Sequence, residues 1–506
     1  SGALSLDYKF NQNHSLFANA IYNWRDDREN RFRVTYDGLE PEYDGEEIIG
    51  YTGSIVRQTK GGIDNNRNQN RRLEEQKVQN YSLRGEHLLS PKLDMDWQAN
   101  YAKAAEFRPN ERYIEFEQED ITFNQDLTNP ERPFIAAGGE DLNEYAFSSL
   151  TENTDLTKET EFGAKLNFRL PFSVIGGKKG RLRTGLRLRI KDKSRDNIFF
   201  SYSPLGDEPS LSGIPNSFFS GKGYNVGEKY VPGTFASASY LGGLNLADAS
   251  MYEPEVDPSE FLAENYQANE EIYAAYIRWD QDITDKLSMI IGARVENTHI
   301  DYTGNRVLDE EELEGQINTS NSYTNVLPNL SFKYNATKDF ILRAAFTTAL
   351  ARPNYYALAP FLNVNAGDEE LIAGNPELKA TYAYNFDFMA ENYFKSVGLV
   401  SAGAFYKKLN DFIYNYNNSS YQAADFANDF PGQDNPLAAG DTWNFIQSRN
   451  GESVNVYGFE VSFQRQFDFL PGFLKNFGLY TNYTFTKSDA KGVTNEDGEV
   501  RNDVSL

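Results

Sequence analysis

Apolar and polar residues alternate with a period of two along much of the chain. The clearest stretch is 180–192, where every second residue is apolar or small and the residues between them are mostly basic. The apolar positions are Leu182, Thr184, Leu186, Leu188 and Ile190, and the basic ones are Arg181, Arg183, Arg187, Arg189 and Lys191. This period predicts a β-strand with one apolar and one charged face. In a transmembrane barrel the apolar face would meet lipid and the basic face would line a wet interior.

The same alternation recurs at 4–10, 16–25, 93–101, 161–170, 381–391 and 457–467. Short turns separate some strands, and long polar segments separate others: 26–79, 105–158, 195–268, 301–322, 352–379 and 415–454. Short turns on one rim and long loops on the other are typical of outer-membrane barrels, whose long loops face outward from the cell. The pattern predicts an all-β fold, a transmembrane antiparallel β-barrel of about fourteen strands with short periplasmic turns and long extracellular loops.

Composition agrees with this fold and excludes other classes. The mean hydropathy of −0.62 and the lack of any long apolar run exclude transmembrane helices. Cysteine is absent, which removes cysteine-based metal and thiol chemistry. The net charge of −25 argues against nucleic acid as a partner. Acidic residues gather at 37–47, 115–120 and 309–314, where we expect solvated loops between strands or, less favoured, loops that take up cations.

Several runs of residues resemble the barrel of TonB-dependent outer-membrane receptors. They are V-L-P-N-L-S-F-K-Y (326–334), L-R-A-A-F-T-T-A-L-A-R-P (342–353), G-N-P-E-L-K (374–379), A-F-Y-K-K-L-N-D-F-I (404–413), V-Y-G-F-E (456–460) and L-P-G-F-L-K-N-F-G-L-Y-T-N-Y-T-F-T (470–486). Their physical role is mainly architectural. Arg352-Pro353 should end a strand, because proline has no N–H for the ladder, and Gly374-Asn375-Pro376 should form a turn.

The resemblance implies a receptor that binds a scarce external solute and imports it across the outer membrane with energy transmitted by TonB. Members carry an N-terminal plug followed by a barrel of about 22 strands. We therefore expect 1–506 to be one barrel domain that lacks the plug and the last strands. The solute would be an oligosaccharide or a ferric siderophore. Expected partners are TonB, through the plug, outer-membrane lipid and, in some relatives, a surface lipoprotein lid; no cofactor and no enzymatic activity are expected.

Candidate ligand contacts fall into two groups. The aromatic candidates Tyr224, Tyr230, Tyr355, Tyr356 and Trp443 lie in the long segments and could stack on a ligand, pack within the loops or sit at the lipid interface. The basic candidates occupy the alternating positions that we expect to face the barrel interior: Arg183, Arg187, Arg189 and Arg343. They could guide an anionic ligand or pair with acidic plug residues. The three histidines, His14, His87 and His299, are isolated in sequence, so no metal site is predicted.

Two alternatives stay open. One is a passive outer-membrane porin without coupling to TonB. The other is a cell-surface β-rich glycan-binding protein or hydrolase that uses paired carboxylates. The chain has no G-x-S-x-G elbow, which argues against a serine hydrolase.

Overall fold

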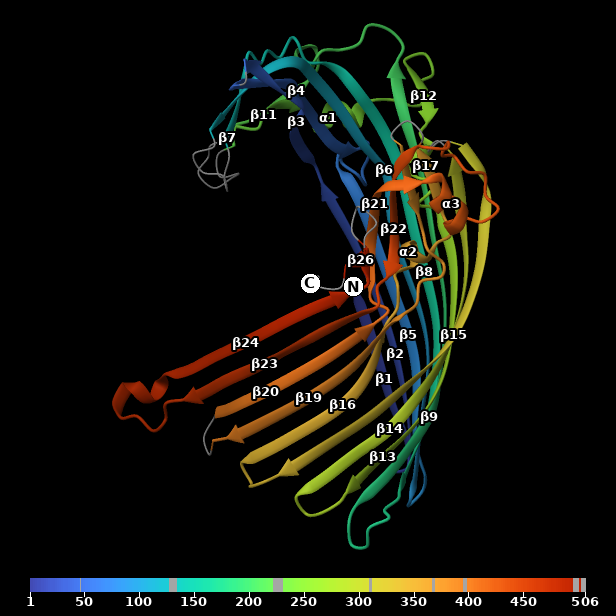
Figure 1. Ribbon diagram of the computed structural model, residues 1–506, viewed down its shortest axis with the longest axis vertical. Helices are drawn as coiled ribbons and strands as arrows, with labels where there is room; N and C mark the ends of the chain where they lie inside the picture. The colour runs from blue at the N-terminus through green and yellow to red at the C-terminus, as the bar shows by residue number, and fades with distance from the viewer. Residues whose placement is uncertain are drawn as a thin grey trace.

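The computed structural model describes all residues except 46, 127–133, 222–230, 309–311, 366–368, 395–397, 495–499 and 502–506. Its main feature is one large curved antiparallel wall, shown in Figure 1. Fourteen strands make this wall, each paired with the next. They are β1 (Gly2–Asn11), β2 (His14–Glu29), β5 (Arg72–Ser90), β6 (Leu93–Asp126), β8 (Ala146–Pro171), β9 (Gly180–Pro204), β13 (Tyr266–Asp282), β14 (Leu287–Leu308), β15 (Glu312–Asn335), β16 (Phe340–Ala351), β19 (Thr381–Tyr393), β20 (Gly398–Asn410), β23 (Ser453–Gln466) and β24 (Gly478–Lys491).

The predicted fold class and strand number are confirmed. The whole sheet contains 22 strands, because eight further strands extend from the wall within the long connections. Within the described residues, β1 and β24 do not pair with each other, so the wall is open there. No helix among these residues is long and apolar enough to cross a membrane.

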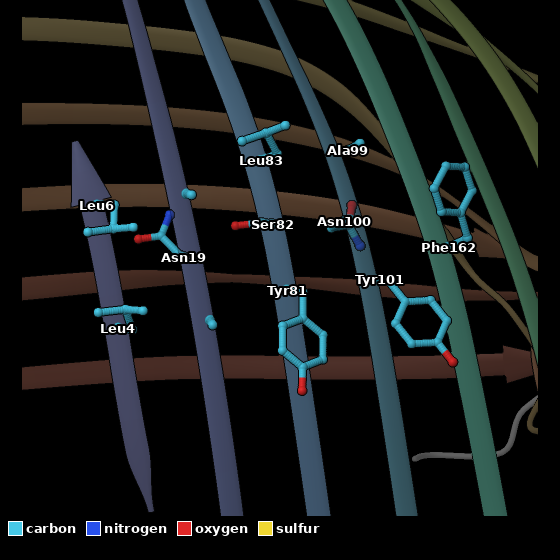
Figure 2. A pocket seen from close by; sticks show the side chains of 12 residues that line it. Leu4, Leu6, Asn19, Tyr81, Ser82, Leu83, Ala99, Asn100, Tyr101 and Phe162 are labelled. Atoms are coloured by element: carbon cyan, nitrogen blue, oxygen red, sulfur yellow. The ribbon is translucent and has the colours of Figure 1, made fainter. Parts of the chain in front are cut away.

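The two faces of the wall follow from the period of two. On β9, Leu186 points to the outer face and is 60% exposed, whereas Arg183 and Arg189 on the other parity point to the inner face, where they pair with acidic residues of β13. Figure 2 shows the outer face over β1, β2, β5, β6 and β8, where Leu4, Tyr81 and Phe162 surround a shallow apolar hollow. Such exposed apolar side chains would be costly in water and are the surface that lipid requires.

The two rims differ as the sequence predicts. On one rim, short turns such as Asn11–His14 and Ser90–Leu93 join neighbouring strands. The other rim carries the elements of the long connections. These are β3 (Arg31–Asp44), β4 (Glu47–Gly62), β7 (Phe134–Gly138), η1 (Leu211–Gly213), β10 (Asn216–Phe219), β11 (Gly233–Ala236), α1 (Ala238–Gly243), β12 (Tyr252–Val256), η2 (Pro258–Glu260), α2 (Tyr355–Leu358), β17 (Leu362–Asn365), β18 (Glu370–Ala373), β21 (Ile413–Gln422), α3 (Ala423–Asp429) and β22 (Thr442–Asn450). Of the three remaining short elements, η3 (Gly472–Asn476) lies in the connection between β23 and β24, whereas β25 (Val493–Thr494) and β26 (Val500–Arg501) follow β24, and β25 lies beside β21.

One expectation is corrected: much of the long polar segments is strand rather than loop. β6 runs for 34 residues and includes the acidic stretch 115–120, which was expected between strands. The β14–β15 hairpin likewise runs through most of 301–322. A ladder satisfies backbone N–H and C=O groups that a loop would leave to water, so the strands continue beyond the apolar band.

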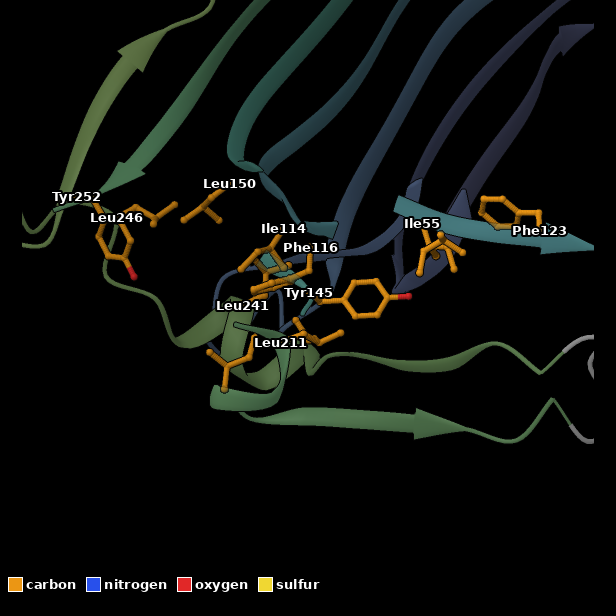
Figure 3. Packing of buried hydrophobic residues seen from close by; sticks show 13 residues of the cluster. Ile55, Ile114, Phe116, Phe123, Tyr145, Leu150, Leu211, Leu241, Leu246 and Tyr252 are labelled. Atoms are coloured by element: carbon orange, nitrogen blue, oxygen red, sulfur yellow. The ribbon is translucent and has the colours of Figure 1, made fainter. Parts of the chain in front are cut away.

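Beyond the wall, the long connections build hydrophobic cores of their own. The largest surrounds Phe116, Tyr145 and Leu241, where the ends of β4, β6 and β8 meet α1 and η1 (Figure 3). A second core joins β17, β18, β21, β22 and α3, which we call the side sheet. The side sheet attaches to the wall where β17 pairs in parallel with the end of β14. The long-connection rim is therefore a packed structure that can hold side chains in fixed positions.

Candidate ligand-binding site

The inner face of β9, β13 and β14 carries a chain of charged side chains near the long-connection rim. Arg189 contacts Glu270 at 2.6 Å, and Arg352 contacts Glu296 at 2.7 Å and Glu270 at 4.0 Å. Arg294 also pairs with Glu296, at 2.6 Å. Glu270 is 4% exposed, so its negative charge depends on these cations. The cations here are thus largely neutralised by carboxylates of the wall itself.

Helix α2 lies against this inner face. β16 ends at Ala351, directly before Arg352-Pro353, as the sequence predicts. The Asn354 side chain then caps α2 by accepting a hydrogen bond from the Ala357 N–H at 2.7 Å. The helix thereby presents Tyr355, whose ring lies 5.6 Å from Lys191 Nζ and 5.5 Å from Lys193 Nζ.

The turn at Gly374 is fitted against the end of α2. The Gly374 N–H donates to the Phe361 carbonyl at 3.0 Å, and the Asn375 N–H donates to the Ala357 carbonyl at 2.7 Å. A Cβ atom at position 374 would lie 1.7 Å from the Ala359 carbonyl oxygen, which no side chain permits. This close approach explains the glycine of the predicted Gly-Asn-Pro turn.

A cavity of about 1350 Å³ opens beside this turn. β15 pairs with β16 only from Asn329 to Asn335, whereas β16 pairs with β19 along its whole length. The wall therefore separates between β15 and β16 toward the long-connection rim, and the side sheet borders the opening. Amide side chains line it from every side: Asn321, Asn325, Asn375, Asn410, Asn428, Gln433, Gln447 and Asn450.

The remaining lining of this amide-lined cavity is mixed. Its aromatic side chains are Tyr323, Phe361, Tyr382, Tyr384 and Phe430, and its charged ones are Glu377, Lys379, Asp411, Asp429 and Arg449. Arg449 is already paired with Asp429 at 2.6 Å. Asn325 and Asn428 have no side-chain hydrogen bond within the described residues, so their amides are free to bind a ligand. An amide both donates and accepts, which suits a ligand rich in hydroxyl groups.

The predicted basic candidates are dispersed along the wall. Arg183 pairs with Asp280 at 2.9 Å, and Arg343 pairs with Glu391 at 3.2 Å. Together with Arg189 they are held by carboxylates of neighbouring strands, an arrangement that the sequence interpretation did not consider. Arg187 is exposed and makes no ion pair with any residue that the structure describes.

The predicted aromatic candidates have different surroundings. Tyr355 and Tyr356 lie on α2, and Tyr356 stacks on Phe361, which lines the cavity. Burial, with the nearby carboxylate of Glu270 adding to it, raises the pKa of the Tyr355 phenol, which stays a hydrogen-bond donor. Trp443 is 5% exposed inside the side-sheet core, where it packs within the loops. Tyr224 and Tyr230 lie outside the described residues.

Sequence reasoning missed the cavity and its amides. Asparagine is common in polar loops, and nothing in the spacing shows that residues from 321 to 450 meet at one place. It also treated the histidines as isolated, and this is corrected: His14 and His87 are directly opposite on β2 and β5. No group of three or more His, Cys, Asp or Glu side chains with metal-binding geometry occurs within the described residues.

Comparison with known proteins gives one family match. The family model described as TonB dependent receptor-like, beta-barrel, matches residues 23–504. No curated protein matches the chain significantly.

Several solved structures are similar to this chain at low identity. The ferric-catecholate import receptor Fiu from E. coli K12 is 12% identical with a TM-score of 0.48, over 98% of this chain and 64% of its own. The siderophore receptor PiuA from Acinetobacter baumannii is 12% identical with a TM-score of 0.44, over 99% and 64%. The hemophore receptor HasR from Serratia marcescens, in complex with HasA and heme, is 9% identical with a TM-score of 0.40, over 97% and 68%. The chain thus spans about two thirds of the length of these proteins.

Proposed function

Because the chain belongs to the TonB-dependent receptors through its β-barrel domain, we propose that it forms the barrel of an outer-membrane receptor that imports an external solute with energy transmitted by TonB. The family consists of transport receptors rather than enzymes. The outer face supports this proposal, because its exposed apolar side chains suit lipid. Contact with TonB would come through a plug segment, as the family resemblance implies.

We propose further that the imported solute is a neutral oligosaccharide bound in the amide-lined cavity. The observation that carries this proposal is the set of eight amide side chains around about 1350 Å³, interleaved with aromatic rings. Amides match the paired donors and acceptors of sugar hydroxyls, and aromatic faces match their C–H faces. The volume is suited to a short oligosaccharide rather than to a single ion.

Charge supports the same choice over a ferric siderophore. The chain has a net charge of −25, which repels an anionic iron chelate at long range. Lys191 and Lys193, the cations beside Tyr355, both lie within 4 Å of Glu159, at 2.9 and 3.9 Å. An anionic ligand would therefore have to displace an existing carboxylate partner, whereas a neutral one would not.

The test combines binding and uptake in the full-length receptor. Binding of a panel of labelled neutral oligosaccharides and of a ferric tricatecholate would be measured by titration in detergent. Asn325→Ala and Asn428→Ala should each weaken oligosaccharide binding about two- to twelvefold, the value of one hydrogen bond of about 0.5–1.5 kcal/mol. Asn66→Ala, an exposed asparagine in the β4–β5 connection, is the matched control and should bind normally.

Uptake by cells then separates a receptor from a porin. Import that stops when the proton gradient is collapsed supports coupling to TonB. Import that continues at the same rate would favour a passive porin. If only the ferric tricatecholate binds, and both asparagine variants bind it normally, the cavity assignment is wrong although the family assignment stands.

A further inference from the structure

Two of the three histidines of the chain meet at the short-turn rim of the wall. His14 is the first residue of β2 and lies directly opposite His87 of β5. Their Nδ1 atoms are 3.0 Å apart, and the ring centroids are 5.2 Å apart. Both side chains are half-buried on the outer face, on the same parities as Leu16 and Tyr81. The pair is unrelated to the cavity and to the charged inner face.

A thioether completes the row. Met95 of β6 lies directly opposite His87 and therefore on the same face of the wall. Side chains of directly opposed residues start about 4.5–5.5 Å apart at Cβ, a distance that the flexible methionine side chain readily spans. Three neighbouring strands thus place two imidazoles and one thioether side by side, although Met95 lies 81 positions after His14 in sequence.

The space around this row is shaped by a glycine. Trp97 Nε1 donates a hydrogen bond to His87 Nε2 at 3.1 Å. Gly85 lies opposite Trp97, and a Cβ at position 85 would lie 2.4 Å from Trp97 Nε1 and 2.6 Å from His87 Nε2. Only glycine leaves room for this contact, which fixes the orientation of the His87 ring. With its Nε2 accepting from tryptophan, neutral His87 carries its proton on Nδ1 and donates it to His14 Nδ1.

From this geometry we propose that His14, His87 and Met95 form a binding site for a soft monovalent cation, copper(I). Two metal–nitrogen bonds of about 2.0 Å, with nitrogens 3.0 Å apart, subtend about 97° at the metal. That angle is too small for linear coordination and leaves positions for a third ligand. The thioether of Met95 selects copper(I) over harder cations such as zinc(II).

Binding requires one rearrangement that balances without an added proton. The His87 proton moves from Nδ1 to Nε2, and Nδ1 takes up the metal. The new Nε2–H cannot accept from Trp97, so the indole N–H must give up its hydrogen bond. Copper binding and the Trp97 hydrogen bond therefore compete for His87.

Because of this competition, removing the Trp97 donor and removing a copper ligand should change the copper(I) affinity in opposite directions. The probe is copper(I) alone, titrated anaerobically into the full-length receptor in detergent against a chromogenic copper(I) chelator. His14→Gln and Met95→Leu should each weaken binding at least tenfold, whereas Trp97→Phe should strengthen it about two- to twelvefold, because the competing hydrogen bond is removed. His299→Gln, at the third histidine, which pairs with Asp301 at 3.2 Å, is the matched control and should bind as the parent does.

Zinc(II) supplies a second measurement. Met95→Leu should leave zinc(II) affinity unchanged, because zinc has little preference for a thioether. Heat-dependent mobility in detergent gels confirms that each variant is folded. The assignment is overturned if the His14→Gln/His87→Gln double variant retains the parent affinity for copper(I), or if Trp97→Phe weakens binding.

Discussion

Replacing Gly374 with alanine should open the contact between α2 and the turn that borders the amide-lined cavity. The new Cβ would lie 1.7 Å from the Ala359 carbonyl oxygen, against at least 3.0 Å in ordinary packing. The turn must therefore move by more than 1 Å, and both backbone hydrogen bonds that hold it, Gly374 N–H to Phe361 and Asn375 N–H to Ala357, are broken or stretched. Two such bonds together contribute about 1–3 kcal/mol.

Native-state hydrogen exchange measures this local loss directly. A cost of about 1–3 kcal/mol corresponds to an exchange rate about 5- to 150-fold faster at the amides of 374–375, with the amides of the wall strands unchanged. Oligosaccharide affinity should fall as well, because Asn375 and Glu377 of this segment line the cavity. Ala359 and Gly374 pack in the same way whatever the ligand is, so the exchange result does not depend on the solute.

Gly243→Ala is the matched control. Gly243 ends α1, and a Cβ there meets no atom within 4 Å. This variant should exchange as the parent does at 374–375. If Gly374→Ala also exchanges at the parent rate, the turn does not hold α2 through the Ala359 contact, and the geometric argument for this glycine fails.

Two further predictions concern the wall and the rim. Leu186→Arg places a charge on the outer face and should lower the stability of the membrane-inserted barrel by about 2–4 kcal/mol. Arg187→Gln changes a residue of the inner face and should alter the stability little. Reversible unfolding in lipid vesicles measures both variants, and equal effects would contradict the assignment of faces. Tyr145 is fully buried and donates to Glu140 at 2.7 Å, and burial, with the carboxylate of Glu140 adding to it, raises its pKa above the ordinary 10.0. Above pH 10 this phenol ionises in the unfolded chain before it does so in the folded one, so the stability of the fold decreases as the pH rises. In Tyr145→Phe the guanidinium midpoint should therefore decrease less between pH 9 and pH 11 than in the parent. An equal decrease in both proteins would show that Tyr145 does not cause this pH dependence.

Much of the wall could be predicted from the sequence, because a strand in a lipid-facing barrel must keep its period of two for its whole length. Leu186 and Arg187 are neighbours in sequence and face opposite environments, so the pattern of each strand indicates which of its faces is toward lipid. The ends of the strands were harder to predict from the sequence. Beyond the apolar band one face of β6 packs Ile114 and Phe116 into the core of the long connections, while the other face is acidic, and the stretch 115–120 therefore has the composition of a loop.

The contacts within the sites depend on the pairing register between neighbouring strands, which the alternation of apolar and polar residues does not determine. Arg189 meets Glu270, and His14 meets His87, because particular residues of different strands are paired, and a shift of one residue would place each partner on the opposite face. The basic residues were therefore recognised as inward, but their partners were sought in a plug rather than in the adjacent strand. Trp443 is a further example, because the sequence shows that the residue is aromatic but does not show that it packs inside the side-sheet core.

The pairing of charges within the wall bears on selectivity. Glu270 and Glu296 tie Arg189, Arg294 and Arg352 into one inner-face network before any ligand arrives. Releasing Arg189 to bind an anion would leave the buried Glu270 with Arg352, 4.0 Å away, as its remaining partner in this network; losing both partners would cost about 3–5 kcal/mol. The free amides of Asn325 and Asn428 carry no such cost, since they exchange hydrogen bonds with water for hydrogen bonds with a ligand. The charged residues of the wall thus contribute to the architecture, and under the proposed function the neutral polar groups of the rim would bind the ligand.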